Sequence, residues 1–297
     1  MHLVAQDLVN GILAGGIFAV VALGFSLVWG IMNIINLAHG AFIMLGAYAT
    51  YQLVTTFGLD PFATLPVSFL LLFALGYLLQ RWVINWVARA PVLVTFLLTF
   101  GLSLLIVNLA LIVWSPDSRG VHPSYGGANF SLGDVTVPLA KLLTLVAALI
   151  ITGLMHLWLT RSRTGRAIRA TSMDIGAAQL SGVRVSRIYA IVFGLGAGLA
   201  GVAGTLLSLS YSITPNMGDP FLIKGFVVCV LGGLGSVQGA LIGGLVYGIV
   251  EAFATQIDVT IGTQHISGSG LQDAIALVVL LIVLIVRPRG IAGKAVA

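Results

Sequence analysis

Long apolar stretches separated by short polar segments dominate the pattern of this chain. The apolar stretches cover about residues 8–31, 40–57, 62–80, 91–115, 138–160, 188–211, 221–256 and 271–286. Roughly 20 apolar residues cross a bilayer as a helix. Each stretch should be helical, because lipid offers no partner to unpaired backbone groups. We therefore predict an all-α, polytopic bundle of transmembrane helices that forms a single domain over residues 1–297.

The stretch at 221–256 is too long for one span and is interrupted by glycine. Its segment "LGGLGSVQGA", residues 231–240, contains four glycines. This pattern predicts a short helix, a turn and a second helix that runs back in the opposite direction. The whole chain would then cross the membrane about nine times, or about eight times if the short helix is only re-entrant.

Small residues four positions apart mark another predicted span. In "GLGAGLAGVAG", residues 194–204, such pairs include Gly194 with Gly198 and Ala200 with Gly204. Faces of this kind let helix backbones approach closely. We therefore expect helix packing here. Dinucleotide binding is excluded because the glycines lie inside a span and not between a strand and a helix.

The composition limits the class of protein. Hydrophobic residues make up 59% of the 297 residues and charged residues 8%, whereas a soluble domain contains about 25% charged residues. The single cysteine, Cys229, excludes an intramolecular disulfide. The net charge of +5 is explained by membrane topology, so we expect no nucleic-acid partner.

Most basic residues fall in three segments that alternating spans place on one side of the membrane. They are Arg81 and Arg89; Arg161, Arg163, Arg166, Arg169, Arg184 and Arg187; and Arg287, Arg289 and Lys294. Because Lys and Arg collect in cytoplasmic loops, we expect this side and the C-terminus to be cytoplasmic. The largest outer segment is then the loop 116–137, whose Gly, Pro, Ser and Asn content predicts turns or a short hairpin.

Polar residues interrupt the apolar pattern in "NIINLAHGAF" at 33–42 and in the segment 231–240. They are Asn33, Asn36, His39 and Gln238. Non-helical backbone at membrane depth is tolerated where it is buried in protein or lines a cavity, and polar side chains usually face the bundle interior. We predict that these residues line part of a substrate pathway. The alternative is that they cap broken helices and tie neighbouring helices together.

The two interruptions resemble each other. A shift of 199 residues places the His-Gly-Ala at 39–41 on the Gln-Gly-Ala at 238–240, and Tyr48 on Tyr247. Both lead into a predicted helix that runs in the same direction. The match predicts an internal repeat, a common plan for transport proteins.

Several kinds of functional site are missing from the sequence. It has no G-x-x-x-x-G-K-[ST] motif, no His/Cys cluster with metal-ligand spacing and no nucleophile beside an evident base. We predict no catalytic residue, no metal site and no cofactor in this chain. The charged residues of the spans, Lys141, Lys224, Glu251 and Asp273, are expected toward the outer ends. Proton-driven carriers usually keep an ionisable residue near the midplane, so energy for uphill transport would come from elsewhere.

The longest and most basic inner loop, residues 161–187, is predicted to couple the chain to a partner. Ser172 can cap a helix over about 173–181, Asp174 suits its first turn and Gly182 can end it. A helix this short needs a surface to dock into. The residues expected to take part are Asp174, Gly176, Ala177, Ala178, Gln179, Gly182, Arg166 and Arg169. The alternative is that the helix lies back on the protein's own spans or on lipid headgroups.

Four segments resemble the permease subunit of branched-chain amino acid ABC importers, specifically the shorter of the two permeases of such systems. They are "NIINLAHGAFIMLGAY" at 33–48, "GRAIRATSMDIGAAQLSGV" at 165–183, "VVCVLGGLGSVQGALIGGL" at 227–245 and "LIVRPRGI" at 284–291. The second is similar to the coupling loop of importer permeases, which has Glu-Ala-Ala, three further residues and Gly. Ala177, Ala178 and Gly182 match this pattern, whereas Gly176 stands at the Glu position.

The resemblance implies a multi-pass protein of the bacterial inner membrane. It implies as partners a second homologous permease, two cytoplasmic ATPase subunits that bind ATP and Mg, and a periplasmic substrate-binding protein. The chain would be a transport subunit and not an enzyme, and would form the translocation pathway for branched-chain or related amino acids. The family also carries amides, urea and small organic acids, so the sequence leaves the solute open.

Two other functions stay open at this point. One is a self-sufficient secondary carrier or facilitator, against which the lack of a midplane carboxylate argues. The other is a membrane scaffold without a transport role. The interrupted helices near residues 31–40 and 231–240 argue against a scaffold, because packing alone requires no interruption.

Overall fold

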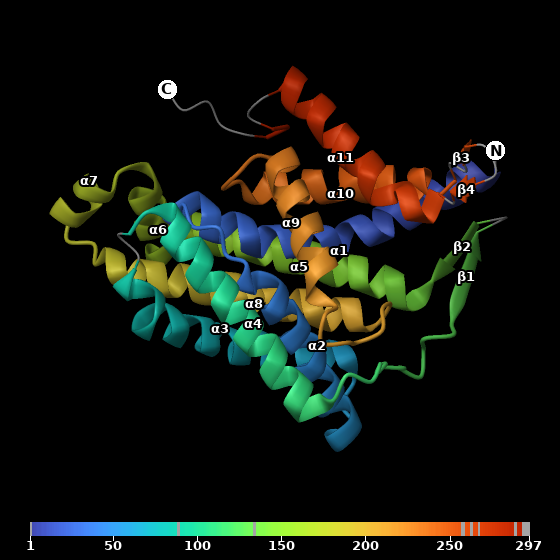
Figure 1. Cartoon of the computed structure of the whole chain (residues 1–297), viewed down its shortest axis with the longest axis horizontal. Coiled ribbons are helices and arrows are strands. Elements are labelled where there is room, and N and C mark those ends of the chain that lie inside the picture. The colour runs from blue at the N-terminus through green and yellow to red at the C-terminus, as the bar shows by residue number, and fades with distance from the viewer. Residues whose placement is uncertain are drawn as a thin grey trace.

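The computed structural model describes residues 2–87, 90–132, 135–256, 259–261, 264–266, 268–287 and 290–292. These residues form helices, two short 3-10 helices and two small hairpins (Figure 1). The helices are α1 His2–Met32, α2 Ala38–Phe57, η1 Pro61–Thr64, α3 Leu65–Trp82, η2 Ile84–Trp86, α4 Val92–Trp114, α5 Leu139–Arg161, α6 Arg163–Met173, α7 Ile175–Leu180, α8 Val185–Ser208, α9 Gly218–Gly232, α10 Val237–Ala254 and α11 Gly268–Val286. The strands are β1 Asn129–Leu132, β2 Val135–Pro138, β3 Val259–Ile261 and β4 Gln264–Ile266.

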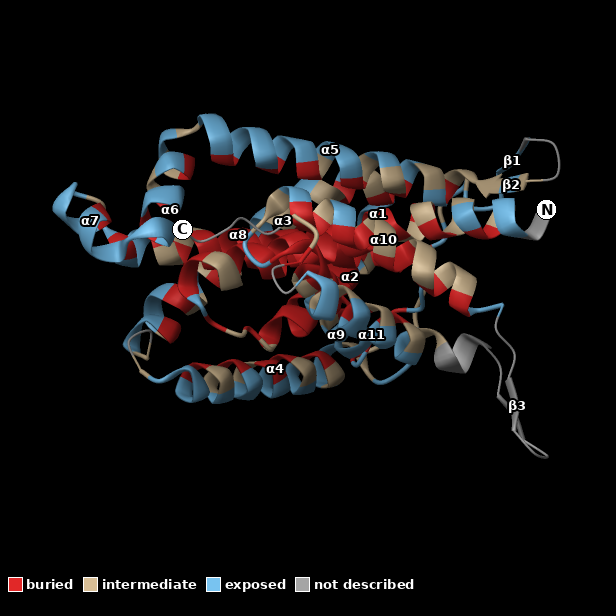
Figure 2. Cartoon of the chain, turned by 90° about the horizontal axis from the view of Figure 1, so that it is seen from above, coloured by how far each residue is buried: buried red, intermediate tan, exposed pale blue. Residues whose placement is uncertain are grey.

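Helices α1 and α8 form the centre of the bundle. Of their most apolar segments, 89% and 94% of the residues are buried, whereas the corresponding value for α4 is 17%. Figure 2 shows the same division, with a buried centre and with exposed outer surfaces along α4 and α5. The exposed surface of α4 is itself apolar, for example at Leu93 and Ile112. An apolar face without a protein partner suits contact with lipid.

Six described helical segments are long and apolar enough to cross a membrane. They are Val4–Met32, Pro61–Trp86, Val92–Trp114, Leu139–Arg161, Val185–Leu207 and Val237–Ala254. The chain is therefore a mostly helical, polytopic membrane protein, as predicted. Helix α2 with 20 residues and α9 with 15 do not belong to this set. The count of eight or nine crossings remains a prediction.

Both predicted interruptions are present. Helix α1 ends at Met32 and α2 begins at Ala38, and α9 ends at Gly232 before α10 begins at Val237. In the second interruption Gly233 and Gly235 have φ angles of 104° and 78°. Glycine adopts such positive angles readily because it has no Cβ. The internal repeat remains a prediction.

The inner loop differs from its prediction. The predicted helix over about 173–181 is present as α7, Ile175–Leu180, but the prediction missed α6, which precedes α7 and meets it at Asp174. Helix α6 begins at Arg163, directly after α5, because the Ser162 side chain accepts a hydrogen bond from the Gly165 N–H, at 2.8 Å. Asp174, with extended backbone, then caps α7 in place of Ser172, and its Oδ1 accepts from the Ala177 N–H at 2.9 Å. Gly182 follows α7 with a φ of 82°, as its predicted role requires.

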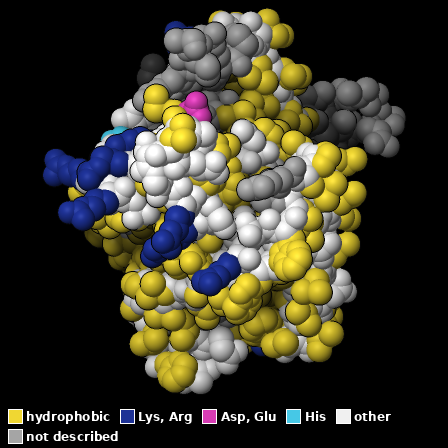
Figure 3. Space-filling view, turned by 90° about the vertical axis from the view of Figure 1, so that its left-hand side faces the viewer, with side chains coloured by type: hydrophobic (Ala, Val, Ile, Leu, Met, Phe, Trp, Pro, Cys, Tyr) yellow, Lys and Arg dark blue, Asp and Glu magenta, His cyan; other side chains and the backbone are white. Residues whose placement is uncertain are grey.

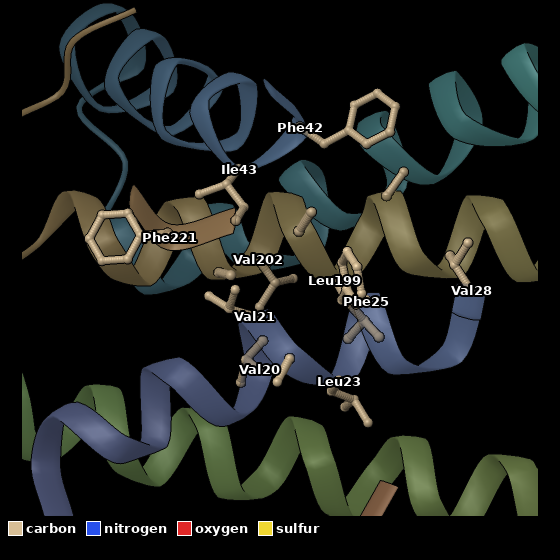
Figure 4. Packing of buried hydrophobic residues seen from close by; sticks show 14 of the residues in the cluster. Val20, Val21, Leu23, Phe25, Val28, Phe42, Ile43, Leu199, Val202 and Phe221 are labelled. Carbon is tan, nitrogen blue, oxygen red and sulfur yellow. The ribbon is translucent and has the colours of Figure 1, made fainter. Parts of the chain in front are cut away.

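The small residues of α8 pack against neighbouring helices, as predicted. A methyl group added at Gly204 would overlap the backbone carbonyl of Ile43 in α2, and one at Gly198 would lie 2.9 Å from the Phe69 ring of α3. Figure 4 shows larger side chains packed around α8, with Leu199 and Val202 next to Val21 and Phe25 of α1. The small residues of α8 thus let α1, α2 and α3 pack closely around it.

The outer loop contains the predicted hairpin. Strands β1 and β2 pair in antiparallel register, with Phe130 opposite Val137. The hairpin contacts the start of α1, since the backbone N–H of Thr136 donates to the Gln6 side chain at 2.9 Å and the Gln6 amide donates back to the Thr136 carbonyl. A second contact joins the loop to the α8–α9 connection, where Arg119 and Ile213 exchange backbone hydrogen bonds.

Basic side chains gather at the end of the molecule where α6 and α7 lie (Figure 3). Arg81 lies in the last turn of α3, Arg161 ends α5 and Arg184 immediately precedes α8. This arrangement agrees with the grouping expected from the sequence. Arg89, Arg289 and Lys294 of the same predicted groups lie outside the described residues.

Candidate functional site

Asn33 ends helix α1. Its φ of 52° lies in the left-handed region, and its N–H donates to the Trp29 carbonyl at 2.9 Å. Asparagine tolerates this conformation better than most residues, so it serves as a helix terminator. The side chain is exposed. The end of helix α1 therefore accounts for the backbone conformation of Asn33.

Asn36 and His39 are both buried where α2 begins. The Asn36 Oδ1 accepts a hydrogen bond from the Ala38 N–H at 3.1 Å, so the side chain caps the start of α2. The His39 Nε2 lies 3.0 Å from the Val21 carbonyl of α1. A carbonyl only accepts, so we assign the proton to Nε2. The ring also packs edge-on against Phe25, with 5.8 Å between ring centroids.

Two polar atoms of this interruption have no hydrogen-bond partner among the described residues. They are the Asn36 Nδ2, a donor, and the His39 Nδ1, which is an acceptor when the proton is on Nε2. Buried polar atoms are usually paired, so a buried donor and acceptor three residues apart are unusual. Both side chains lie inside the bundle, with exposed fractions of 1% and 0%. Their place on a substrate pathway remains a prediction.

The second interruption also contacts α1. The Gly235 N–H donates to the Ser26 Oγ at 3.0 Å, and Ser236 caps α10 by accepting from the Gly239 N–H at 3.0 Å. Ser26 lies five residues after Val21 on α1, about 7.5 Å along the helix. The two interruptions therefore meet neighbouring turns of one central helix. Gln238, in contrast, is exposed, so the four predicted pathway residues do not share one buried cluster.

A buried charged cluster joins α9, α10 and α11. The Lys224 Nζ lies 2.5 Å from the Glu251 Oε1 and 3.3 Å from the Asp273 Oδ1. It also lies 5.5 Å from the ring centroid of Phe18 in α1. The Lys224 and Glu251 side chains are 9% and 12% exposed, and Asp273 is 61% exposed.

Sequence reasoning noted these charges but missed their pairing. It treated Lys224, Glu251 and Asp273 as separate residues near span ends. The available signal was one cation and two anions in otherwise apolar segments, since ionisable residues in spans usually pair with one another. The Glu251 Oε2 is buried and has no partner among the described residues. The cluster is therefore a second candidate for a functional role inside the bundle.

The predicted coupling residues lie on α6 and α7, except for Asp174 between the two helices and Gly182 after α7. Gly176, Ala177 and Gln179 are exposed, but Ala178 is 3% exposed and faces the protein. Ala178 is therefore not available to a partner in this conformation, and the coupling role of the other residues remains a prediction. Beside the small residues, Met173 and Leu180 are 86% and 93% exposed. Large apolar side chains that the described residues leave uncovered are typical of contact sites for proteins or membranes.

Arg169 fixes this segment to α5. Its guanidinium donates to the backbone carbonyls of Leu159 and Thr160 at the end of α5, the second at 3.2 Å. Arg166 donates to the Arg161 carbonyl at 3.2 Å. Basic side chains commonly satisfy the last carbonyls of a helix in this way. Both arginines thus hold α6 in a defined position, and α7 follows from it.

Most of the chain matches a known protein family. The family described as "Branched-chain amino acid transport system / permease component" matches residues 8–286. The chain belongs to this family. Both interruptions, the charged cluster and the α6–α7 segment lie within the residues that the family matches.

Individual relatives support the same assignment over nearly the whole chain. The high-affinity branched-chain amino acid transport system permease protein BraD of Pseudomonas aeruginosa is 32% identical, covering 97% of this chain and 95% of its own length. The corresponding protein LivH of Escherichia coli K12 has the same three values. A probable branched-chain amino acid transport permease protein of Methanocaldococcus jannaschii is 31% identical over 96% of this chain and 91% of its own length. No solved structure is a significant match.

Proposed function

We propose that this chain is the permease subunit of an ATP-binding-cassette importer. It forms the translocation pathway for branched-chain or related amino acids, which a periplasmic binding protein delivers. It works with a second homologous permease and with two cytoplasmic ATPase subunits that bind ATP and Mg. It lies in a bacterial inner membrane with its C-terminus in the cytoplasm. The observation that carries this proposal is the family match over residues 8–286.

The α6–α7 segment supports the assignment of an ATPase partner. It projects from the basic end of the molecule and exposes Met173 and Leu180 almost completely. Asp174 caps α7, and Arg169 anchors α6 on α5, so the segment has a defined shape without a partner. An exposed apolar surface whose shape is fixed before binding loses little conformational entropy when a partner binds, so it suits contact with an ATPase subunit.

The interruptions beside α1 support a pathway through the membrane part. Broken helices, with polar groups at the break, recur at substrate sites of transporters. The unpaired Asn36 Nδ2 and His39 Nδ1 would offer a donor and an acceptor to a zwitterion if the helices moved apart. The relatives named above carry branched-chain amino acids in their names, which makes leucine, isoleucine and valine the first solutes to test.

Reconstituted transport tests the proposal. The chain is co-expressed with the second permease, the ATPase subunits and the binding protein of the same organism, purified and placed in vesicles that contain ATP. We expect uptake of labelled leucine that requires both ATP and the binding protein. Leu180→Asp should abolish uptake, whereas Leu180→Met should retain it. Uptake that continues without ATP would overturn the importer assignment.

The buried charged cluster supports a second candidate function, that of a secondary carrier. A secondary carrier needs an ionisable group inside the bundle, and the Lys224–Glu251 pair supplies a candidate. This alternative predicts that the chain alone moves solute when a proton gradient is imposed. Vesicles that hold only this chain distinguish the two functions, because an importer permease would show no gradient-driven uptake there.

A further inference from the structure

A pocket of about 460 Å³ lies between the last turn of α3 and the start of α8. Its lining residues are Tyr77, Arg81, Arg184, Ser186, Arg187 and Ala190. A volume between about 300 and 1,000 Å³ is typical of small-ligand sites. Residues from two helices that are about 100 positions apart in sequence thus meet around one opening.

The pocket is strongly cationic. Three of its six lining residues are arginines, and the ion pairs found among the described residues all involve Lys224, in another part of the bundle. Asp174 is the only acidic residue between positions 135 and 218, and its carboxylate caps α7. The N-terminus of α8, with its positive dipole end, begins at Val185 between two of the arginines. One guanidinium group can donate two parallel hydrogen bonds to two oxygens of a phosphate, so this site suits a phosphate.

The surroundings place the pocket at the depth of lipid headgroups. Trp82 directly follows Arg81 and is 64% exposed, and Trp86 is 85% exposed. Tryptophan concentrates at the boundary between hydrocarbon and water. Leu70, Leu71 and Leu78 of the same helix α3 are exposed apolar side chains. An anion in the pocket would therefore have hydrocarbon beside it, which a free phosphate or an acidic protein does not require.

We propose that this pocket binds the headgroup of an anionic phospholipid, with Arg81, Arg184 and Arg187 holding the phosphodiester. The acyl chains lie along the exposed apolar face of α3. The bound lipid joins the end of α3 to the start of α8, which directly follows the α6–α7 segment. This inference rests on the membrane location of the chain and is independent of the proposed solute and of the ATPase.

Native mass spectrometry of the purified full-length chain tests the site. Phosphatidylglycerol or cardiolipin is titrated in detergent, with phosphatidylcholine and inorganic phosphate as separate arms. We expect one tightly bound anionic lipid. In the double variant Arg81→Gln/Arg187→Gln its affinity should fall roughly thirty-fold. The matched control Arg161→Gln/Arg163→Gln removes two exposed arginines at the same end, outside the pocket, and should bind as the unchanged chain does.

Each of the following results would overturn the proposal. Equal lipid affinity in the pocket variant and the control would show that the headgroup binds elsewhere. Displacement of the lipid by millimolar inorganic phosphate, or equal binding of phosphatidylcholine, would show a site without lipid selectivity. Unchanged lipid binding together with lost ATPase co-purification would assign the arginines to a protein contact. Equal melting temperatures of both variants in detergent ensure that a loss of binding is not a loss of fold.

Discussion

Lys224 of α9 and Glu251 of α10 form a buried ion pair, with 2.5 Å between Nζ and Oε1. Removing one partner of such a pair leaves an uncompensated charge inside the protein, whereas replacing both by apolar residues is often nearly neutral. The pair therefore gives a stability test that separates a structural clamp from a working charge. Asp273 contributes less to this test, because it is largely exposed.

We predict that Lys224→Met destabilises the protein by about 3–5 kcal/mol and that Lys224→Met/Glu251→Leu recovers most of this loss. The melting temperature of the purified chain in detergent measures both effects. A double variant as unstable as the single variant would contradict the clamp. A double variant that is stable but inactive in reconstituted uptake would assign the charges to transport.

The exposed surface of α7 leads to a second prediction. Leu180→Asp should abolish co-purification of the ATPase subunits without changing the melting temperature of this chain, because Leu180 is 93% exposed. Ala178→Trp should instead lower the melting temperature, because Ala178 is buried and overpacking typically costs about 1–3 kcal/mol. Retained ATPase binding in Leu180→Asp would show that α7 is not the docking surface.

The cap at the start of α2 separates the two roles of Asn36. Asn36→Leu removes the acceptor for the Ala38 N–H and should destabilise the chain by about 0.5–2 kcal/mol, whereas Asn36→Ser keeps an acceptor. If the amide also contacts solute, Asn36→Ser should retain the melting temperature and lose uptake of labelled leucine. Full uptake by Asn36→Ser would leave capping as the whole role of this residue.

Close helix packing gives a prediction with a matched control. Gly204→Ala should destabilise the protein by about 1–3 kcal/mol, since the new methyl group overlaps the Ile43 carbonyl of α2. Gly153→Ala in α5 should leave stability equal or slightly higher, because nothing lies within 4 Å of the added methyl group. Equal melting temperatures for the two variants would contradict the observed α2–α8 contact.

The orientation is tested by cysteine labelling in intact cells. The native Cys229 is fully buried, so we expect it to react little with the reagent. Cys229→Ser removes any remaining labelling of this residue. A cysteine at Arg163 should react only when the reagent reaches the cytoplasm, and one at Ser124 should react from outside. Labelling of both positions from the same side would contradict the threading of the chain.

Much of the architecture could be predicted from the sequence because it depends on local properties. Apolar length predicts spanning helices, and glycine clusters predict where they stop, since both effects act within a few residues. The interruptions at 33–37 and 233–236, the hairpin in the outer loop and the turn at Gly182 after α7 were therefore predictable. Helix α6 and the capping residue of α7 were not, because Ser162, Ser172 and Asp174 are all competent caps and the local sequence does not select between them.

Only the tertiary structure decided which distant residues meet. Lys224 and Glu251 pair because α9 and α10 pack side by side, and Arg81 meets Arg187 because α3 packs along α8. Ala178 faces inward while Leu180 does not, although both fit an apolar helix equally well. Periodicity and composition report a residue's chemistry and the local geometry of its backbone. The packing of the helices determines which residues become neighbours. Close packing depends on how the surfaces of distant helices fit together, and the sequence pattern alone does not show which helices meet.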